Sequence, residues 1–301
     1  MDTKELNALA TEGANPASMA LDTLSARQLV ELINAEDRKV APAVGTQLEN
    51  IARAVDVIAE KLENGGRLVY MGAGTSGRLG ILDASECPPT YGVPPEMVVG
   101  LIAGGPEAIK QAQENVEDSL TAGPEQMKAI GFTGRDVLCA IAASGRTPYC
   151  LAAMDYAHEL GAPVICVTCN GSCPMAKKAD IPICPEVGPE VLSGSTRMKS
   201  GTAQKMVLNM LTTASMIRLG KVYGPYMVDV QATNEKLRVR SRRIVMNVTG
   251  KDEAEAQKAL DEAQGQVKLA CAMLGAGLSR EEAEEALGRN KGRLRPVLEG
   301  K

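Results

Sequence analysis

The middle of the chain alternates short apolar runs with longer helical patterns, and this alternation constrains its fold more than any other feature. The apolar runs occupy residues 67–71, 97–102, 136–142, 164–168 and 181–184. Each run is continuously apolar, which is typical of strands that helices cover on both faces. Helical patterns lie between the runs, at 76–86, 106–121 and 148–160. This order predicts an α/β fold with a doubly wound, five-stranded parallel sheet.

Helical sequence flanks the sheet pattern on both sides. Before the sheet, apolar residues recur at steps of three and four between Val44 and Leu62. Farther upstream, Ser25 and Gln28 predict a capping box at the start of a helix. After the fifth run, the helical patterns occupy residues 199–219, 228–246, 252–264, 266–275 and 280–289.

From these patterns we expect three parts in the chain. A helical lead-in occupies residues 1–56, a sheet domain spans residues 57–225, and a small helical module spans residues 226–301. Glycines and polar caps separate the helices of the module, as is usual between short helices that pack on one another.

Two loops rich in glycine and hydroxyl groups follow strands of the expected sheet. Residues 72–77 read Gly-Ala-Gly-Thr-Ser-Gly, and residues 144–148 read Ser-Gly-Arg-Thr-Pro. Parallel sheets bind ligands at the carboxyl ends of their strands, and the helix after each loop offers unpaired N–H groups to an anion. We therefore expect a phosphate site without a metal, formed by Gly74, Thr75, Ser76, Ser144, Gly145, Arg146 and Thr147.

A dinucleotide site is the alternative for the first loop, because residues 72–77 formally match G-x-G-x-x-G. Such a site needs an acidic residue at the end of the next strand to bind the ribose. Residues 102–105 read Ile-Ala-Gly-Gly, and the proline-rich segment 87–95 lies where a tight crossover is needed. Nicotinamide and flavin sites are therefore disfavoured, and no cofactor is expected.

Composition and charge argue against several classes of partner. The 301 residues include no Trp, one Phe and six Tyr, so few aromatic rings are present to stack on bases. A net charge of −4 gives no electrostatic reason to bind nucleic acid or an anionic membrane. No apolar run approaches the roughly 18 residues of a membrane-spanning helix. The basic run from Lys236 to Arg243 is therefore interpreted as a solvated or interface face of a helix.

Cysteine and histidine usage indicates a reduced compartment and no metal site. Eight cysteines are too few for a disulfide scaffold of this length, and residues 1–5 lack the order of a secretion signal, so a cytoplasmic location is expected. Cys166, Cys169 and Cys173 allow a zinc site by spacing, but no second C-x-x-C accompanies them. The single histidine, His158, is expected on the surface of a helix.

Four stretches match the pattern of one known family, namely residues 71–80, 83–90, 188–205 and 229–234. Residues 188–205 are the most specific, and they read Gly-Pro-Glu-Val-Leu-Ser-Gly-Ser-Thr-Arg-Met-Lys-Ser-Gly-Thr-Ala-Gln-Lys. On these residues the chain resembles the sugar isomerase (SIS) domain proteins, and it closely resembles the N-acetylmuramic acid 6-phosphate etherases. The resemblance extends from about residue 5 to the C-terminus.

The resemblance implies a lyase that removes the D-lactyl ether from carbon 3 of N-acetylmuramic acid 6-phosphate. In this family a carboxylate takes the carbon 2 proton of the open-chain aldehyde, and a carboxylic acid protonates the departing lactyl oxygen. Water then adds to the unsaturated aldehyde, giving N-acetylglucosamine 6-phosphate and D-lactate. The family pattern places the acid at Glu86 and the second glutamate, the base, at Glu117.

The resemblance also implies further substrate contacts and a homodimer. The expected contacts are Glu190 and the hydroxyl groups of Ser193, Ser195 and Thr196. The alternative for Glu190 is a carboxylate that interacts with the dipole of a helix in its first turn. Two copies of the chain are expected to pair through helices of the sheet domain.

Local sequence explains the two catalytic glutamates unequally. Glu86 ends the expected helix 76–86, just before prolines that are expected to terminate it in a rigid turn. Glu117 lies eleven residues after Pro106 in the expected helix 106–121, roughly 16 Å from the helix N-terminus. Glu117 would therefore reach the site only if that helix lies obliquely or serves a partner's site across a dimer interface.

Two other functions remain open at this point. Related SIS domains occur in non-catalytic proteins that sense sugar phosphates and regulate a kinase. An aldose–ketose isomerase would move the same carbon 2 proton and leave the ether intact. The presence of both Glu86 and Glu117, and a length too short for the tandem domains of the regulatory relatives, favour the etherase.

Overall fold

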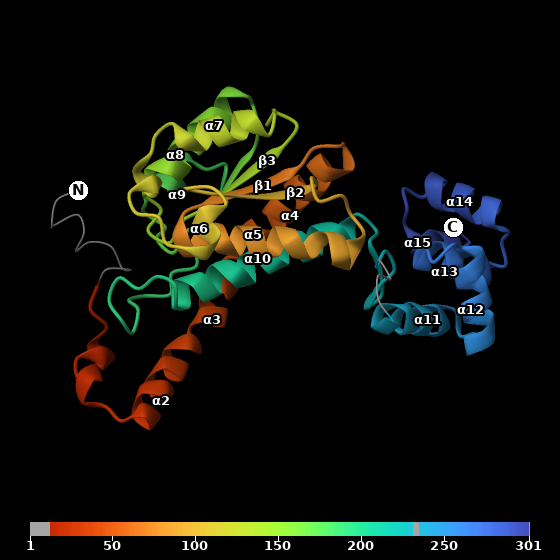
Figure 1. Cartoon of the computed structure of the whole chain (residues 1–301), viewed down its shortest axis with the longest axis horizontal. Helices are drawn as coiled ribbons and strands as arrows, with labels where there is room; N and C mark the ends of the chain where they lie inside the picture. Colours follow the sequence, from red (N-terminus) through yellow and green to blue (C-terminus); the bar gives the residue numbers. More distant parts are fainter. Residues whose placement is uncertain (1–12, 231–234, 301) are drawn as a thin grey trace. The chain divides into compact units, whose positions relative to one another are not determined.

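The computed structural model describes residues 13–230 and 235–300, and a five-stranded parallel sheet forms its central layer (Figure 1). The strand order is β2-β1-β3-β4-β5, with bounds Val98–Ile102, Leu68–Gly72, Val137–Ile141, Val164–Val167 and Ile181–Ile183. Every neighbouring pair is parallel. The predicted fold class is confirmed, and each strand lies within one residue of its expected bounds.

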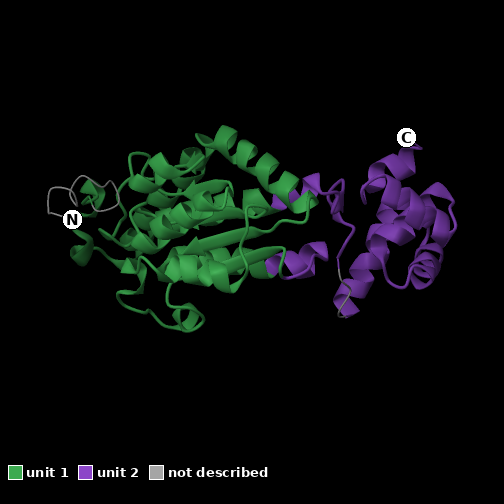
Figure 2. Ribbon diagram, turned by 90° about the horizontal axis from the view of Figure 1, so that it is seen from above, with its two compact units in different colours: residues 1–85, 96–212 green, residues 86–95, 213–301 purple. Residues whose placement is uncertain are grey.

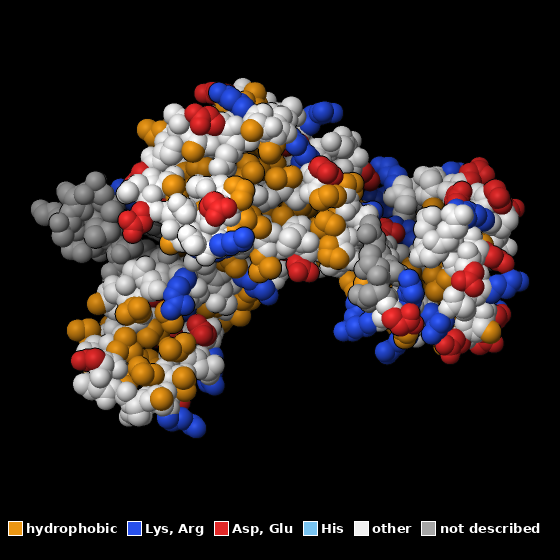
Figure 3. All heavy atoms as spheres, viewed as in Figure 1, with side chains coloured by type: hydrophobic (Ala, Val, Ile, Leu, Met, Phe, Trp, Pro, Cys, Tyr) orange, Lys and Arg blue, Asp and Glu red, His pale blue; other side chains and the backbone are white. Residues whose placement is uncertain are grey.

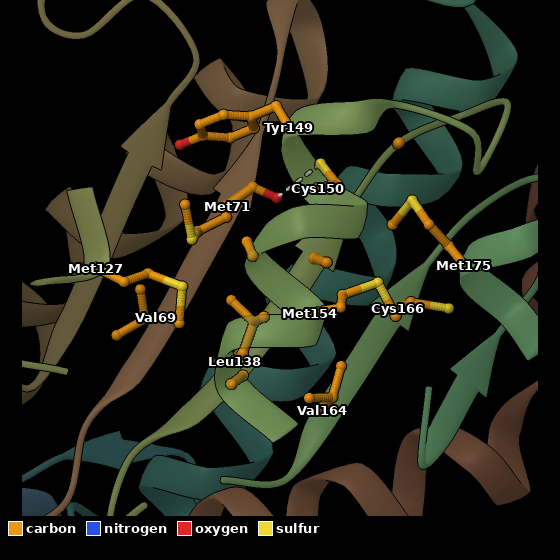
Figure 4. Close-up of a cluster of buried hydrophobic side chains, with 14 of the residues drawn as sticks. Val69, Met71, Met127, Leu138, Tyr149, Cys150, Met154, Val164, Cys166 and Met175 are labelled. Carbon is orange, nitrogen blue, oxygen red and sulfur yellow. Dashed lines mark hydrogen bonds between the residues drawn. The ribbon is translucent and has the colours of Figure 1, made fainter. Parts of the chain in front are cut away.

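Helices α7 (Ala122–Ala129) and α8 (Pro148–Glu159) cover one face of the sheet (Figure 1). Their buried side chains meet those of the strands in a core that holds one phenylalanine and no tryptophan. Figure 4 labels the main members, which are Val69, Met71, Met127, Leu138, Tyr149, Cys150, Met154, Val164, Cys166 and Met175. Methionine and cysteine fill this space because their flexible or small side chains adapt to irregular gaps.

Helices α5 (Gly74–Tyr91) and α4 (Leu48–Glu63) also pack on the sheet, and α10 (Lys199–Arg218) packs on α5. A Cβ on Gly80 would lie 2.9 Å from the Cβ of Tyr70, so α5 sits directly on β1. The buried carboxylate of Asp83 accepts hydrogen bonds from the Tyr70 hydroxyl at 3.0 Å and from Asn209 Nδ2 of α10 at 2.8 Å. Asp83 therefore joins α5 to both β1 and α10.

The lead-in consists of short helices before α4. They are η1 (Pro16–Ser18), η2 (Leu21–Thr23), α2 (Ala26–Asp37) and α3 (Val40–Gly45). The capping box of Ser25 and Gln28 is confirmed at the start of α2. Among the residues of α2, only Glu36 is buried, so most of this helix is left uncovered.

The chain divides into two compact units (Figure 2). One unit comprises residues 1–85 and 96–212, and the other comprises residues 86–95 and 213–301. The second unit contains the hairpin β6 (Val222–Tyr223) and β7 (Tyr226–Met227). The three-part division expected from the sequence stays a prediction.

The second unit also contains α11 (Glu235–Thr249), α12 (Glu253–Glu262), α13 (Val267–Ala276), α14 (Arg280–Arg289) and α15 (Leu294–Glu299). Helix α13 is buried along most of its length and forms the centre of this unit's core. A helix is expected at 228–246, but in the described residues α11 begins at Glu235. Residues 228–230 follow β7 and are not helical, and residues 231–234 lie outside the description. Helix α15 was not expected, since six residues are too few to establish a helical period.

The expected helix 106–121 is wrong. Helix α6 covers only Glu107–Lys110, and a separate 3-10 turn, η3, covers Val116–Asp118. Gln111 is extended, and Asn115 has a left-handed φ of +61°, so the chain leaves helical geometry between the two elements. Polar residues at 111–115 supply no apolar stripe that would hold a continuous helix against the sheet.

The expected end of the first helix is also wrong. Helix α5 continues through Pro88 and Pro89 to Tyr91, and Gly92 with φ of +63° ends it. The prolines remove two backbone donors from the last turns. The Gly92 N–H donates to the carbonyl of Pro88 at 2.9 Å and so closes the final turn. Glu86 therefore lies inside a helix rather than at a rigid turn.

The described part of the chain, residues 13–230 and 235–300, has no helix that is both long enough and apolar enough to cross a bilayer.

A buried ion pair fastens the start of β1 to the start of β3. Arg67 donates from Nε at 3.0 Å and from Nη2 at 2.9 Å to the two carboxylate oxygens of Asp136. Burial alone would raise the pKa of Asp136, but hydrogen bonds from Arg67 and from the Thr133 N–H outweigh burial and hold that pKa below its ordinary value. The ionised carboxylate is therefore the form that stabilises the fold.

We expect Asp136→Asn to lower the free energy of unfolding by about 2 kcal/mol at pH 7. Fully buried pairs lose about 3–5 kcal/mol when one partner is removed, but the Arg67 side chain is 24% exposed. Because the folded-state pKa is lowered, the wild-type advantage is present above about pH 4 and disappears as the pH falls through the lowered value. Urea unfolding of both proteins between pH 7 and pH 3 measures this difference, with the exposed Asp155→Asn as control. An advantage that does not change with pH would contradict the assignment.

Candidate functional site

The first loop joins β1 to α5 through a sharp turn. β1 ends at Gly72 and α5 begins at Gly74, whose φ of +52° favours glycine. A Cβ on Gly77 would lie 2.6 Å from the carbonyl oxygen of Gly72, so the first turn of α5 packs tightly on the strand end. The first N–H groups of α5, which have no partner within the helix, therefore start at the carboxyl edge of the sheet.

The two hydroxyl groups of this loop have different surroundings. Ser76 is 7% exposed, and its Oγ donates to Gln204 Oε1 of α10 at 2.9 Å. Ser76 therefore offers a ligand its N–H rather than its hydroxyl proton. Thr75 is half-buried, and its Cγ2 would lie 3.4 Å from a Cβ on Gly201 in α10. The start of α10 is thus part of the surroundings of the first loop.

The second loop leaves β3 and starts α8. Gly145 has a φ of +67°, and a Cβ there would lie 2.1 Å from Cys173 Sγ and 2.7 Å from Thr168 Oγ1. The Gly145 carbonyl accepts a hydrogen bond from the Met175 N–H at 3.1 Å, which ties the loop to α9 (Pro174–Lys178). Thr147 is the N-cap residue of α8, but its side chain makes no capping hydrogen bond. The structure therefore holds the loop backbone firmly and leaves the Thr147 hydroxyl out of helix capping.

The two loops leave the sheet at the same edge. β1 and β3 are neighbouring parallel strands, and Gly72 pairs with Ile141 at their carboxyl ends. Ser144, Arg146 and Thr147 are partly exposed there. The parallel register thus brings together the two groups of residues that the sequence predicts to bind phosphate.

Glu190 has a structural partner that accounts for its burial. It is 0% exposed, and its two carboxylate oxygens accept hydrogen bonds from the N–H groups of Lys199 at 3.0 Å and Ser200 at 2.9 Å. These N–H groups belong to the first turn of α10, where a negative charge is favourable. Both carboxylate oxygens therefore accept hydrogen bonds from helix α10, as the dipole-partner alternative expects, and a substrate contact of Glu190 stays a prediction.

The hydroxyl groups near Glu190 differ in exposure. Ser193 is exposed, and its Oγ donates to the Gly13 carbonyl at 3.4 Å. Ser195 and Thr196 are half-buried in the turn before α10. Because the Gly201 N–H donates to the Thr196 carbonyl at 3.0 Å, this turn lies against the same start of α10 that borders Thr75. Ser195 and Thr196 are therefore placed near the first loop.

Lys199 forms a buried ion pair that the sequence does not reveal. Its Nζ donates to Glu36 Oε2 at 2.6 Å, and the side chains are 2% and 5% exposed respectively. Burial would raise the pKa of Glu36, but hydrogen bonds from Lys199 and Lys39 outweigh burial and lower it. This pair fastens helix α2 of the lead-in to the start of α10. The match at residues 188–205 includes Lys199, but nothing in the sequence marks Glu36 as its partner.

Glu86 is an exposed carboxylate on the helix that the first loop begins. It lies three residues after Asp83, whose buried carboxylate fixes the rotation of α5 against β1 and α10. This anchor was also missed from the sequence, although residues 83–90 belong to the family pattern. The helix therefore presents Glu86 in a defined direction through the hydrogen bonds of Asp83.

Glu117 is exposed within η3, not within a long helix. The neighbouring Val116 packs against the sheet core, and η3 lies against α8. Burial raises the pKa of Cys150 in the first turn of α8 to about 12, and the negative charge of Glu117 adds to this rise. Glu117 therefore lies close to the start of α8, the helix that the second loop begins. The oblique helix considered for Glu117 is not present.

The cysteines and the single histidine are the remaining candidates for reactive or metal-binding side chains. None of the eight cysteines, which all lie in the described part of the chain, forms a disulfide, and seven of them are buried. Among residues 13–230 and 235–300, no group of three or more His, Cys, Asp or Glu side chains is arranged to hold a metal ion. His158 is exposed on α8, as expected, with Nε2 3.4 Å from a carboxylate oxygen of Asp180.

Comparison with known proteins matches two domain models. Residues 50–158 match the glucokinase regulatory protein N-terminal SIS domain, and residues 111–214 match the SIS domain. Among solved structures, a phosphoheptose isomerase from Neisseria gonorrhoeae is similar, with 21% identity and a TM-score of 0.49 over 63% of this chain and 98% of that chain.

Curated relatives match nearly the whole chain. The N-acetylmuramic acid 6-phosphate etherase of Photorhabdus laumondii is 55% identical over 97% of this chain and 97% of the relative. The protein of the same name from Vibrio atlanticus is 55% identical over 98% of this chain and 96% of the relative. At this identity and coverage, the chain belongs to the N-acetylmuramic acid 6-phosphate etherase family of SIS-domain proteins.

Proposed function

We propose that this chain cleaves the D-lactyl ether of N-acetylmuramic acid 6-phosphate to give N-acetylglucosamine 6-phosphate and D-lactate. The observation that carries the proposal is 55% identity over 97% of the chain to a protein named for this activity. The reaction consists of elimination followed by addition of water. Both steps need only positioned acids and bases, which the two exposed glutamates supply.

The two loops at the carboxyl edge of the sheet bind the 6-phosphate. Thr147 and Ser144 contribute hydroxyl groups, Arg146 contributes charge, and the first turns of α5 and α8 contribute N–H groups. Support for this role comes from the common edge of the two loops and from the absence of a capping bond at Thr147. Gly74, Thr75, Ser76 and Gly145 form the loop backbone, and Ser193, Ser195 and Thr196 extend the contacts toward the sugar.

Glu117 removes the proton from carbon 2 of the open-chain aldehyde. The carbonyl at carbon 1 acidifies this proton, and the electron pair of the broken C–H bond enters the enolate. Support for this role comes from the position of Glu117 beside the first turn of α8, next to the second loop. A base at that place lies beside the helix that the second loop begins, and it serves the site without the oblique helix considered from the sequence.

Glu86 donates a proton to the lactyl oxygen as the carbon 3–oxygen bond breaks. The enolate electrons form the carbon 2–carbon 3 double bond, and D-lactate leaves with the donated proton on its hydroxyl group. Glu86, now ionised, then accepts a proton from the water that adds at carbon 3, and Glu117 returns its proton to carbon 2, which restores both glutamates. Support for this role comes from the family pattern at residues 83–90 and from the anchoring of α5 by Asp83.

A non-catalytic sugar-phosphate sensor is the second candidate. The match of residues 50–158 to a domain of a regulatory protein favours it. That match covers about a third of the chain, whereas the etherases match nearly all of it. A sensor would bind the sugar phosphate and leave both the carbon 2 proton and the ether unchanged, so the exchange experiment below distinguishes the two.

Two copies of the chain form a homodimer in this proposal through helices of the sheet domain, and the amphipathic helix α2 of the lead-in adds to that interface. Val30 is 59% exposed, and Leu29, Leu32 and Ile33 are only partly covered. Figure 3 shows hydrophobic side chains gathered over this lead-in region. An exposed apolar helix face of this kind is typical of an interface. The chain also works in the cytoplasm in this proposal, in keeping with eight cysteines that form no disulfide in the described residues; recovery in a periplasmic fraction would contradict that location.

The amide variants of the two glutamates are expected to fail at different steps in deuterated water. Glu86→Gln keeps the base, so it exchanges deuterium into carbon 2 of unreacted substrate but releases D-lactate at least about 100-fold more slowly than wild type. Glu117→Gln lacks the base, so it is expected neither to exchange deuterium into carbon 2 nor to release D-lactate. Mass spectrometry of the recovered sugar and an enzymatic D-lactate assay measure the two outcomes.

A double variant, Ser144→Ala with Thr147→Val, is the matched control for this experiment. It keeps both glutamates, so it is expected to raise KM while exchange and lactate release remain in their wild-type ratio. Exchange that persists in Glu117→Gln and vanishes in Glu86→Gln would reverse the two roles. Wild-type protein that neither exchanges nor releases lactate, yet binds the substrate, would favour the sensor.

The dimer is tested by the solution mass. Light scattering of the wild-type protein is expected to give twice the 31.7 kDa mass of the chain. Val30→Glu places a charge in the apolar face of α2 and is expected to weaken association by about tenfold or more. Val239→Glu, at a similarly exposed residue of α11, is the control and should leave the mass unchanged. A wild-type monomer with full activity would rule out the dimer.

A further inference from the structure

Asp229 lies in the fourth family stretch, and the proposed reaction assigns it no role. One of its carboxylate oxygens, Oδ2, accepts a hydrogen bond from Lys268 Nζ at 2.6 Å and lies 3.2 Å from Lys221 Nζ. All three side chains are largely buried, with exposed fractions of 20%, 12% and 24% for Asp229, Lys268 and Lys221. Two cations therefore share one carboxylate at partly buried positions.

These charges line a cavity of about 460 Å³ within the second unit. Its apolar lining comes from the segment after β7, from α13 and from α14, and includes Val228, Val230 and Leu287. Gly92 also borders the cavity, and a Cβ there would lie 2.4 Å from the carbonyl oxygen of Asp229. The close approach of the two backbones fixes Asp229 in place. The cavity is therefore preformed, with a charged region and an apolar region.

Hydrogen-bond donors outnumber acceptors in the charged region. Each lysine ammonium has three N–H donors. Asp229 accepts one hydrogen bond from Lys268 and forms an ion pair with Lys221, so N–H groups of both lysines are left for another acceptor. The segment 264–269, which leads into and begins α13, also lines the cavity, and its N-cap residue Gln266 makes no side-chain capping hydrogen bond. The other acid in the lining, Glu284, is exposed and pairs with Arg280 at 2.9 Å. Lysine and backbone N–H groups thus converge with surplus capacity for negatively charged oxygens.

Burial lowers the pKa of Lys268, and Asp229 only partly offsets this effect. A second negative group near Lys268 would therefore offset part of the free-energy cost of burying the charged lysine. The shape of the cavity limits what this group is attached to. A volume of 460 Å³ with valine and leucine walls suits a small organic molecule better than a bare inorganic ion.

We propose that this cavity binds a small organic anion, whose carboxylate or phosphate oxygens lie between Lys221 and Lys268 and whose short carbon chain lies against the apolar wall. The site lies wholly within the second unit and shares no residue with the two loops proposed to bind phosphate. Two sources of such an anion follow from the proposed reaction, since it releases one carboxylate, D-lactate, and one sugar phosphate. The proposal itself does not depend on that reaction, because the cavity and its charges exist without it.

Isothermal titration calorimetry of the full chain tests the site with three probes: D-lactate, N-acetylglucosamine 6-phosphate and inorganic phosphate. We expect saturable binding of D-lactate or of the sugar phosphate that Lys221→Met and Lys268→Met each weaken by about tenfold or more. Asp229→Asn removes the competing carboxylate while keeping the shape, so it is expected to tighten binding. Lys258→Met, at a 78% exposed lysine of α12, is the matched control and should bind as wild type does.

Each outcome of the titrations decides the proposal. Binding of D-lactate that depends on the two lysines supports a carboxylate site, whereas lysine-dependent binding of the sugar phosphate alone supports a phosphate-ester site. No binding of any probe, binding that the lysine variants leave unchanged, or binding of inorganic phosphate alone would overturn it. Circular dichroism of each variant checks folding, and the gain expected from Asp229→Asn is a result that mere damage to the fold would not produce. Failure of the proposed ether cleavage appears separately, as the absence of lactate release by wild-type protein.

Discussion

The parallel pairing of β1 with β3 is the constraint on which the rest of this structure depends. Because Gly72 and Ile141 end their strands side by side, the two glycine and hydroxyl loops leave the sheet at one edge, and α5 and α8 begin there. The Arg67–Asp136 pair fixes the opposite ends of the same two strands. A one-residue change of register would separate the loops and reverse the faces on which the core side chains lie. The proposed phosphate site thus depends on this strand pairing.

The buried and exposed carboxylates of this chain have different tasks. Asp83, Asp136 and Glu190 are buried and use their oxygens on neighbouring donors, so each joins two or more elements. Glu36 does the same with Lys199, and it connects the lead-in to α10. Glu86 and Glu117 are exposed, and the helix or turn that carries each is held by its neighbours. A carboxylate that must gain and lose a proton during a reaction needs this freedom, whereas one that joins elements does not.

The sequence was sufficient to predict the sheet, both loops and the family, and it was insufficient wherever tertiary partners decide local structure. Continuous apolar runs identify buried strands directly, and glycines mark the turns. The helix expected at 106–121 failed because polar residues up to the left-handed Asn115 interrupt it. Pro88 and Pro89 were expected to end α5, but they lie within it. The partners of Glu190, Ser76 and Lys199 are 9 to 163 residues away in sequence, and no local pattern specifies them.

The fate of the ether oxygen tests the central claim, cleavage at carbon 3 by elimination and addition of water. The wild-type reaction is run in water enriched in oxygen-18, and the products are separated for mass spectrometry and carbon-13 spectroscopy. The account predicts the heavy oxygen on carbon 3 of N-acetylglucosamine 6-phosphate, with unlabelled lactate that keeps its D configuration. Heavy oxygen in the hydroxyl group of lactate, with an unlabelled carbon 3, would mean that water attacks the lactyl carbon, and it would contradict the roles given to both glutamates.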